Sequence, residues 1–258
     1  GNEYASGDKL GLNLPGLQEE LLETVTAVGK PVVLVISAGS ALDLSWADAH
    51  VAAIIDSFYP GARGGKAVAE AIFGDFSPSG KLPVTFYQGT ENLPEFTDYD
   101  MSDRTYRYTD KNVLYPFGYG LHYGTIRYEN AQISCAQCSV RDAVDVSVDV
   151  INESSYTIHE SVQAYIQHEE ADAYEPGYQL KGIQTVTLQP KETKRVTISL
   201  KVRDFAIITQ EGECVVRPGS YRIAIGGQQP DARSAKLTGS DVAALVVRRE
   251  GVQTPVEY

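Results

Sequence analysis

Hydrophobic residues follow different patterns in the two halves of this chain of 258 residues. In the first half, apolar residues recur at helical spacing from Leu17 to Val28, which predicts a helix that ends near Gly29. Continuous apolar runs further along are typical of parallel strands that are covered on both faces, and such strands alternating with helices indicate an open α/β sheet. The expected elements are strands at residues 32–36, 41–44 and 52–58 and a helix at residues 46–51.

In the second half, polar and apolar residues alternate with a period of two, as in strands that bury one face. Val144–Val150 shows this pattern most clearly, and the polar residues 152–155 that follow it predict a turn. Further strands are expected at the spacing of a β-sandwich, at residues 161–167, 182–188, 195–200 and 220–225 and after residue 240. The pattern predicts an α/β open-sheet domain over residues 1–128 and an all-β, immunoglobulin-like sandwich over residues 129–258.

Composition agrees with a folded chain, because 43% of the residues are hydrophobic and 22% are charged. The net charge of −12 argues against nucleic acid and anionic membrane surfaces as partners, since both select basic patches. No apolar stretch reaches the length of a membrane span, and the start of the sequence lacks the pattern of a signal peptide. The three cysteines, Cys135, Cys138 and Cys214, do not suggest a disulfide framework or a zinc site, and free thiols are expected. A cytoplasmic location is favoured.

The segment from Tyr59 to Phe86 joins several strong signals. An apolar strand breaks at Pro60, a pair of glycines at residues 64–65 opens a helix, and glycines and a proline at residues 74–80 lead into another strand, which predicts a βαβ unit. Residues 60–86 resemble the C-terminal α/β domain of glycoside hydrolase family three, nearly without gaps. Residues 104–108 and 114–123 resemble two further elements of that family, R-x-Y-R-Y and YPFGYGLSY, with His122 in place of the serine.

This resemblance implies more than the pattern alone. Residues 180–183 and 218–226 resemble the fibronectin type III-like domain that closes many enzymes of the family, and the chain is too short to hold the family's (β/α)8 barrel as well. The chain is thus identified as the C-terminal part of a β-glucosidase or β-xylosidase: the end of the α/β domain plus the fibronectin-like domain. The implied reaction is retaining hydrolysis of a terminal β-linked glucose or xylose, without a cofactor or metal.

The resemblance also implies how catalytic roles are divided. The nucleophile of the family is an aspartate of the barrel, so this chain alone is expected to be inactive and to need a barrel domain or chain as its partner. The acid/base is a glutamate in a loop of the α/β domain, and Glu3 is the candidate here, although a glutamate upstream of Gly1 is an alternative. Glu3 could instead contact substrate without catalysing the reaction, or lie free in solvent.

Two alternatives to a catalytic fragment remain open: a non-catalytic carbohydrate-binding or assembly module, and one chain of a split enzyme. Oligomer formation is also left open. The substrate would be an oligosaccharide or aryl β-glycoside. Tyrosines crowd residues 99–128, where packing over the sheet is favoured over contact with sugar, and Trp46 is expected to pack rather than bind. The acidic residues Glu169, Glu170 and Asp172 are expected in a solvated loop.

Overall fold

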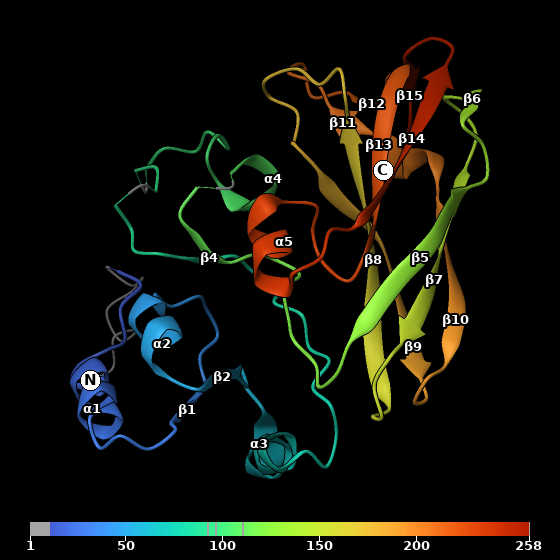
Figure 1. Ribbon diagram of the computed structural model, residues 1–258. Helices are drawn as coiled ribbons and strands as arrows, with labels where there is room; N and C mark the ends of the chain where they lie inside the picture. The colour runs from blue at the N-terminus through green and yellow to red at the C-terminus, as the bar shows by residue number, and fades with distance from the viewer. Residues whose placement is uncertain (1–10, 92, 96, 110, 258) are drawn as a thin grey trace.

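The computed structural model describes residues 11–91, 93–95, 97–109 and 111–257, which form two parts (Figure 1). The first part carries helices and short strands, shown in blue to green, and the second is a β-sandwich, shown mainly in yellow to red. The elements of the first part are α1 (Gln18–Thr26), β1 (Val33–Ile36), α2 (Ser45–His50), β2 (Ala53–Asp56), the 3-10 helix η1 (Gly61–Arg63), α3 (Gly64–Phe73), β3 (Phe86–Tyr87), α4 (Thr105–Tyr108) and β4 (Val113–Tyr115).

Strands β1 and β2 lie parallel, as predicted for an α/β sheet, and Val33 pairs with Ala53 at the start of their register. The predicted βαβ unit is not completed within this sheet. The chain leaves β2 through α3, but β3 pairs antiparallel with β4 in a separate two-stranded sheet. A sequence pattern can show that a strand follows a helix, whereas the choice of partner depends on contacts far away in the chain.

Residues 41–44 do not form the predicted strand. They form a loop from which Leu42 and Leu44 both enter the core, together with Leu22, Phe86 and Leu114. The two leucines therefore reach inward from irregular backbone and not from a strand.

The sandwich consists of a three-stranded sheet, β10-β7-β5, and a five-stranded sheet, β6-β14-β13-β8-β9. A small sheet, β11-β12-β15, closes one end. The elements are β5 (Ile126–Ile133), β6 (Gln137–Ser139), β7 (Val144–Asn152), β8 (Ile158–His168), β9 (Gln179–Leu188), β10 (Thr193–Leu200), η2 (Val202–Phe205), β11 (Ile207–Ile208), β12 (Cys214–Val216), β13 (Gly219–Gly226), α5 (Ala232–Thr238), β14 (Ala243–Glu250) and β15 (Thr254–Pro255).

The period-two pattern of β7 has the predicted effect. Val144, Val146, Val148 and Val150 are fully buried and form the centre of the sandwich core with residues of both sheets. Each valine side chain that is fully buried stabilises the fold by about 1.5–3 kcal/mol relative to an exposed one. The alternation thus fixes which face of β7 turns inward, because a shift of one residue would expose all four valines.

Helix α5 was not predicted from the alternating pattern. Asp231 caps it, since its Oδ1 accepts hydrogen bonds from the backbone N–H groups of Arg233 and Ser234, both at 2.9 Å. Gly239 ends it with a φ of +72°, in the left-handed region that favours glycine. An aspartate and a glycine at this spacing are the sequence signals that mark the helix.

Aromatic residues of the loop before the sandwich pack against β8 and β9. The ring of Tyr106 stacks on Phe117, with 4.1 Å between centroids, and meets the edge of the Tyr165 ring at 6.3 Å. The Tyr106 hydroxyl also accepts a hydrogen bond from the backbone N–H of Leu180 at 3.1 Å. The favoured packing role therefore describes Tyr106, whereas the ring of Tyr99 is almost wholly exposed.

Gln163 on β8 ties the same loop to the sandwich. Its Nε2 donates hydrogen bonds to the carbonyl oxygens of Gly118, at 3.0 Å, and Gly227, at 3.1 Å, while its Oε1 accepts one from Tyr165 Oη at 2.6 Å. Gly118 has a φ of +77°, and a Cβ atom there would collide with Gln163 Oε1. Glycine at position 118 therefore permits both the turn and the close approach.

We expect Tyr106→Ala to lower the free energy of unfolding by about 3 kcal/mol, because it removes a stacked ring and leaves a cavity between the two parts. Tyr99→Ala is the matched control, since it deletes the same atoms from an exposed ring. Urea unfolding of both variants measures the difference. Equal midpoints for the two variants would show that the Tyr106 contact does not hold the two parts together.

Candidate functional site

Glu3, the catalytic candidate from the sequence, lies outside the described residues. The chain after it is described from Gly11, and it is attached to the loop that follows β1: the backbone N–H of Asp43 donates to the carbonyl oxygen of Leu12 at 2.7 Å. Leu14 packs against the core of the first part. Leu12 therefore lies beside the β1 loop.

Strands β1 and β2 end at the same edge of their sheet, where Ile36 pairs with Asp56. Ligands of open α/β sheets bind outside the carboxyl ends of the strands, so this edge is the candidate site. Ser37 and Ser57 follow the two strands with their hydroxyl oxygens 2.8 Å apart, and Ser57 Oγ lies 2.7 Å from the Ile36 carbonyl oxygen, to which it can donate. We call the group of Ser37, Asp56, Ser57 and Tyr59 the strand-end site.

Asp56 is the titratable residue of the strand-end site. Burial raises the pKa of its carboxyl group, and a hydrogen bond from the backbone N–H of Phe58 to Oδ1, at 2.9 Å, opposes that rise. Its Oδ2 is buried and has no hydrogen-bond partner among the described residues. A buried carboxyl oxygen in this position can accept a hydrogen bond from a hydroxyl group of a ligand.

Asp56 was not among the site residues predicted from the sequence. One sequence feature did mark it, because it is an acidic residue at the end of the apolar run of β2. Tyr59 follows it and is largely exposed, with its ring lying against Gly39 of the β1 loop. A Cβ atom at Gly39 would collide with that ring. The strand-end site therefore combines a carboxyl group, two hydroxyls and an open aromatic face, which suit a sugar.

Trp46 lies on α2 and stacks on His50, with 4.3 Å between ring centroids. It also packs against the core of the first part, so the structure gives it the packing role that the sequence favoured. At the start of α3, Gly64 lies against the Pro60 ring, where a Cβ atom would collide, so this glycine serves close packing.

A second group of charged residues joins the two parts of the molecule. Glu160 on β8 is only 1% exposed, and its Oε1 lies 3.2 Å from Lys81 Nζ. Its Oε2 lies 3.6 Å from His122 Nε2, and the Tyr128 hydroxyl of β5 faces the same carboxylate. A buried carboxylate of this kind is held by its partners, so the Lys81 charge and the adjacent His122 ring fix the first part against the sandwich.

The acidic residues after β8 also pair with basic side chains. Arg217 Nη1 contacts Glu175 Oε1 at 2.8 Å and binds Asp172, while Glu170 accepts a hydrogen bond from the backbone N–H of Ser220 at 2.8 Å. Glu169 lies 3.5 Å from the Arg222 guanidinium. Within the described ranges, no group of three or more His, Cys, Asp or Glu side chains is placed to hold a metal ion.

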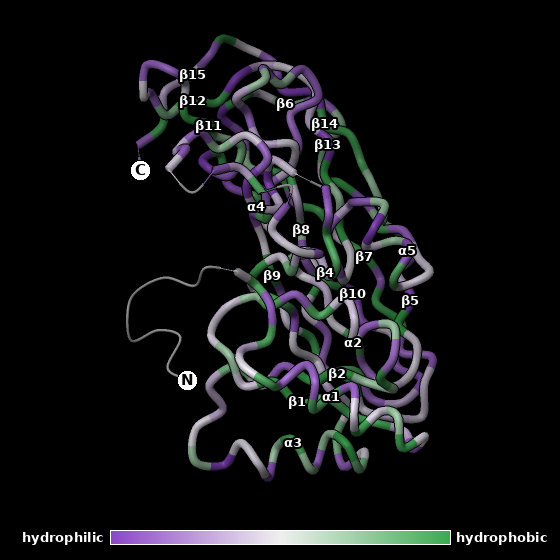
Figure 2. The backbone as a smooth tube through the Cα atoms, turned by 90° about the vertical axis from the view of Figure 1, so that its left-hand side faces the viewer, coloured by the Kyte–Doolittle hydropathy of each residue, from purple (hydrophilic) through white to green (hydrophobic). Residues whose placement is uncertain are grey.

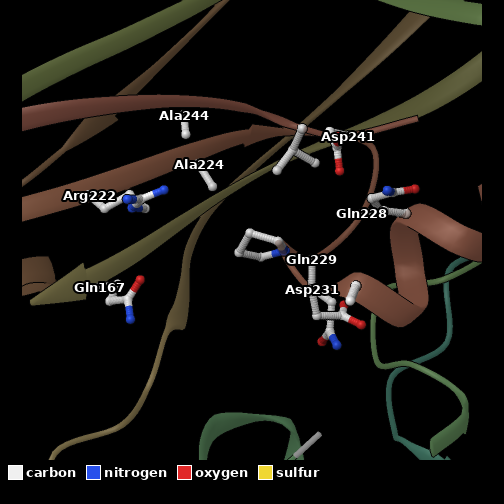
Figure 3. Close-up of a pocket in the computed structure, with 12 residues that line it drawn as sticks. Gln167, Arg222, Ala224, Gln228, Gln229, Asp231, Asp241 and Ala244 are labelled. Carbon is white, nitrogen blue, oxygen red and sulfur yellow. The ribbon is translucent and has the colours of Figure 1, made fainter. Parts of the chain in front are cut away.

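The outer face of the five-stranded sheet carries a pocket of about 340 Å³ next to α5 (Figure 3). Its lining includes Gln167, Arg222, Gln228 and Asp241. None of the lining residues found in the described part of the chain is aromatic, so this pocket offers a sugar no stacking surface. None of the described helices is long and apolar enough to cross a membrane.

Comparison with known families gives two matches. Residues 1–123 match the Glycosyl hydrolase family 3 C-terminal domain, and residues 160–229 match the Fibronectin type III-like domain.

Individual relatives agree with these matches. The chain is 35% identical to a β-xylosidase of Formosa agariphila, covering 90% of this chain and 33% of the relative, and 31% identical to a periplasmic β-glucosidase of Salmonella typhimurium, covering 88% and 31%. The chain thus spans about one third of the length of the curated relatives it matches.

Solved structures are similar over nearly the whole chain. A β-glucosidase from Listeria innocua in complex with glucose matches with a TM-score of 0.80 and 27% identity, covering 97% of this chain and 35% of that one. A family 3 β-glucosidase of Bifidobacterium adolescentis matches with a TM-score of 0.83 and 29% identity, covering 96% and 37%. The predicted fold class, an α/β domain followed by a fibronectin-like sandwich, is confirmed.

The charge group at Glu160 yields a pH prediction. Burial lowers the pKa of His122, against the opposing effect of the Glu160 carboxylate, so the unfolded chain takes up this proton more readily than the folded one. Stability should therefore fall as the pH drops below about 6.5, by about 1.4 kcal/mol for each unit of the pKa shift. His122→Ser should flatten this part of the pH dependence of thermal unfolding.

His159→Ser is the control, because His159 lies exposed on the same strand as Glu160 and bonds to Thr187. If His122→Ser and His159→Ser change the pH dependence equally, His122 does not cause it.

Proposed function

We propose that this chain supplies the acid/base side of the active site of a retaining β-glycosidase. The chain belongs to glycoside hydrolase family 3 and matches the C-terminal portion of its members. The proposed substrates are oligosaccharides or aryl glycosides with a terminal β-linked glucose or xylose. The observation that carries this proposal is the match of residues 1–123, since it includes Glu3 and the strand-end site within one catalytic family domain.

The exposed apolar surface of the first part supports a missing partner. Val33 and Val35 of β1 are 39% and 41% exposed, although parallel strands normally have both faces covered. Leu17, just before α1, Leu21 of α1 and Phe73 of α3 are also exposed. Figure 2 shows hydrophobic stretches of the backbone at this end of the molecule. Exposed apolar residues in such number mark an interaction surface, which we assign to the rest of the protein, including a barrel.

The chemistry follows from the family assignment and from the residues at the strand-end site. Retaining glycosidases place two carboxyl groups about 5 Å apart, one as nucleophile and one as acid/base. We propose that an aspartate of the barrel is the nucleophile and that Glu3 protonates the leaving oxygen, then activates water. We propose that the Asp56 carboxyl, the serine hydroxyls and the Tyr59 ring contact the sugar. The chain without the barrel would bind weakly and would not hydrolyse.

In the complete enzyme, we expect Glu3→Gln to slow hydrolysis of a natural disaccharide by a factor of about 100–10,000, because no acid then protonates the leaving oxygen. Aryl glycosides with good leaving groups should be affected less in the first step, and azide should restore turnover by attacking the glycosyl-enzyme. Kinetics on both substrate types, with and without azide, measure these effects.

Glu19→Gln is the matched control, since Glu19 is an exposed glutamate on the first turn of α1. A Glu3→Gln enzyme within about threefold of the control on the disaccharide would move the acid/base to a glutamate upstream of Gly1. A panel of nitrophenyl glycosides, tested on the complete enzyme, distinguishes glucose from xylose. Inactivity of the complete enzyme on every β-glycoside of the panel would contradict the proposed function itself.

A further inference from the structure

Cys135 and Cys138 stand three positions apart where the chain turns from β5 into β6. Both side chains are half-buried and pack against the same core of the sandwich. The two side chains lie close enough for each thiol to affect the ionisation of the other, and they face the same core, so the turn already brings them together. The third cysteine, Cys214, lies on β12.

A buried cation accompanies this pair of thiols. Cys138 is the register partner of Arg249, because β6 runs parallel to the end of β14. The Arg249 side chain is only 1% exposed, and its guanidinium lies over the Phe205 ring at 4.0 Å from the ring centroid.

The hydrogen bonds of Arg249 are incomplete. Nη2 donates to the carbonyl oxygens of Val140, at 2.7 Å, and Asp142, at 2.8 Å. Nε and Nη1 are buried and have no acceptor among the residues that the structure describes. Buried N–H donors nearly always have a partner, so these two mark a place where negative charge can form.

We propose that Cys135 and Cys138 form a reversible disulfide, closed by a low-molecular-weight disulfide such as oxidised glutathione and assisted by Arg249. The thiolate of one cysteine attacks a sulfur of the small disulfide and releases one thiol, which leaves a mixed disulfide on the protein. The second cysteine gives up its proton, attacks the protein sulfur of that mixed disulfide and releases the other small thiol. Two electrons pass from the cysteine pair to the small disulfide, which leaves as two thiols.

The surroundings of Cys138 determine how the two thiols act. Burial raises the pKa of the Cys138 thiol to about 11, and the Arg249 charge opposes this rise. A thiol with a high pKa is a poor leaving group, so a disulfide that includes Cys138 resists reduction once it has formed. The disulfide is thus suited to persist in an oxidising compartment, and its reduction requires a strongly reducing one.

The test uses the whole chain and trypsin. Cleavage after Arg127 and Arg141 gives one peptide that holds both cysteines and no other. After incubation of the folded protein with oxidised glutathione and alkylation of the remaining thiols, we expect this peptide to be two hydrogens lighter than its reduced form and to carry no alkyl group. The peptide that contains Cys214 should be alkylated, or carry one glutathione.

Variants make the test specific. Cys135→Ser and Cys138→Ser should each abolish the lighter peptide, whereas Cys214→Ser should leave it unchanged. Arg249→Lys, which keeps the charge, should close more slowly than Arg248→Lys, a matched change at the neighbouring position that alternates to the other face of β14. Circular dichroism establishes that each variant is folded.

Two results would overturn the proposal. The first is a peptide that stays fully alkylated at both cysteines in folded wild-type protein exposed to oxidised glutathione at a concentration that oxidises the same peptide after release from the protein. The second is closure that proceeds at the same rate in the Arg249→Lys and Arg248→Lys variants, which would remove Arg249 from the mechanism.

Discussion

The arrangement of the two parts depends on buried polar side chains that β8 presents to the loop before the sandwich. Gln163 is buried and satisfies its amide N–H groups through the Gly118 and Gly227 carbonyl oxygens. Three positions earlier on β8, Glu160 reaches Lys81 and His122. Because each of these groups is costly to leave unpaired, the first part cannot move away from the sandwich without breaking several contacts together. The sandwich thereby acts as the fixed support for the strand-end site.

The opposite side of the first part has no such support. Its core is small, and α1 buries only Leu22 of its apolar residues. Hydrophobic burial is the main source of folding free energy, so a domain that leaves α1 and β1 this exposed gains little from its own packing. Covering of these apolar residues by the proposed barrel would therefore stabilise the first part as well as complete the proposed site.

The sequence predicted best what depends on local pattern. The valines of β7 had to face inward together, and most sandwich strands lie within a few residues of their expected positions. It predicted least where contacts between distant segments decide: the loop that carries Leu42 and Leu44, and the pairing of β3 with β4. The packing of the tyrosine-rich loop could be anticipated from its aromatic content and its resemblance to a family element. The acidic residue at the end of the β2 run was a signal for Asp56, but its burial and its unpaired Oδ2 become visible only in the folded chain.

The position of the strand-end site couples its chemistry to assembly. Ser37 directly follows β1, Asp56 is the last residue of β2, and β1 itself exposes Val33 and Val35. A partner that covers these valines would also lower the access of water to the carboxyl group of Asp56, and a less polar surrounding raises the pKa of a carboxyl group further. The same covering strengthens hydrogen bonds between the site and a sugar, because water then competes less for them. Assembly would thus set both the stability of the domain and the electrostatics of its site.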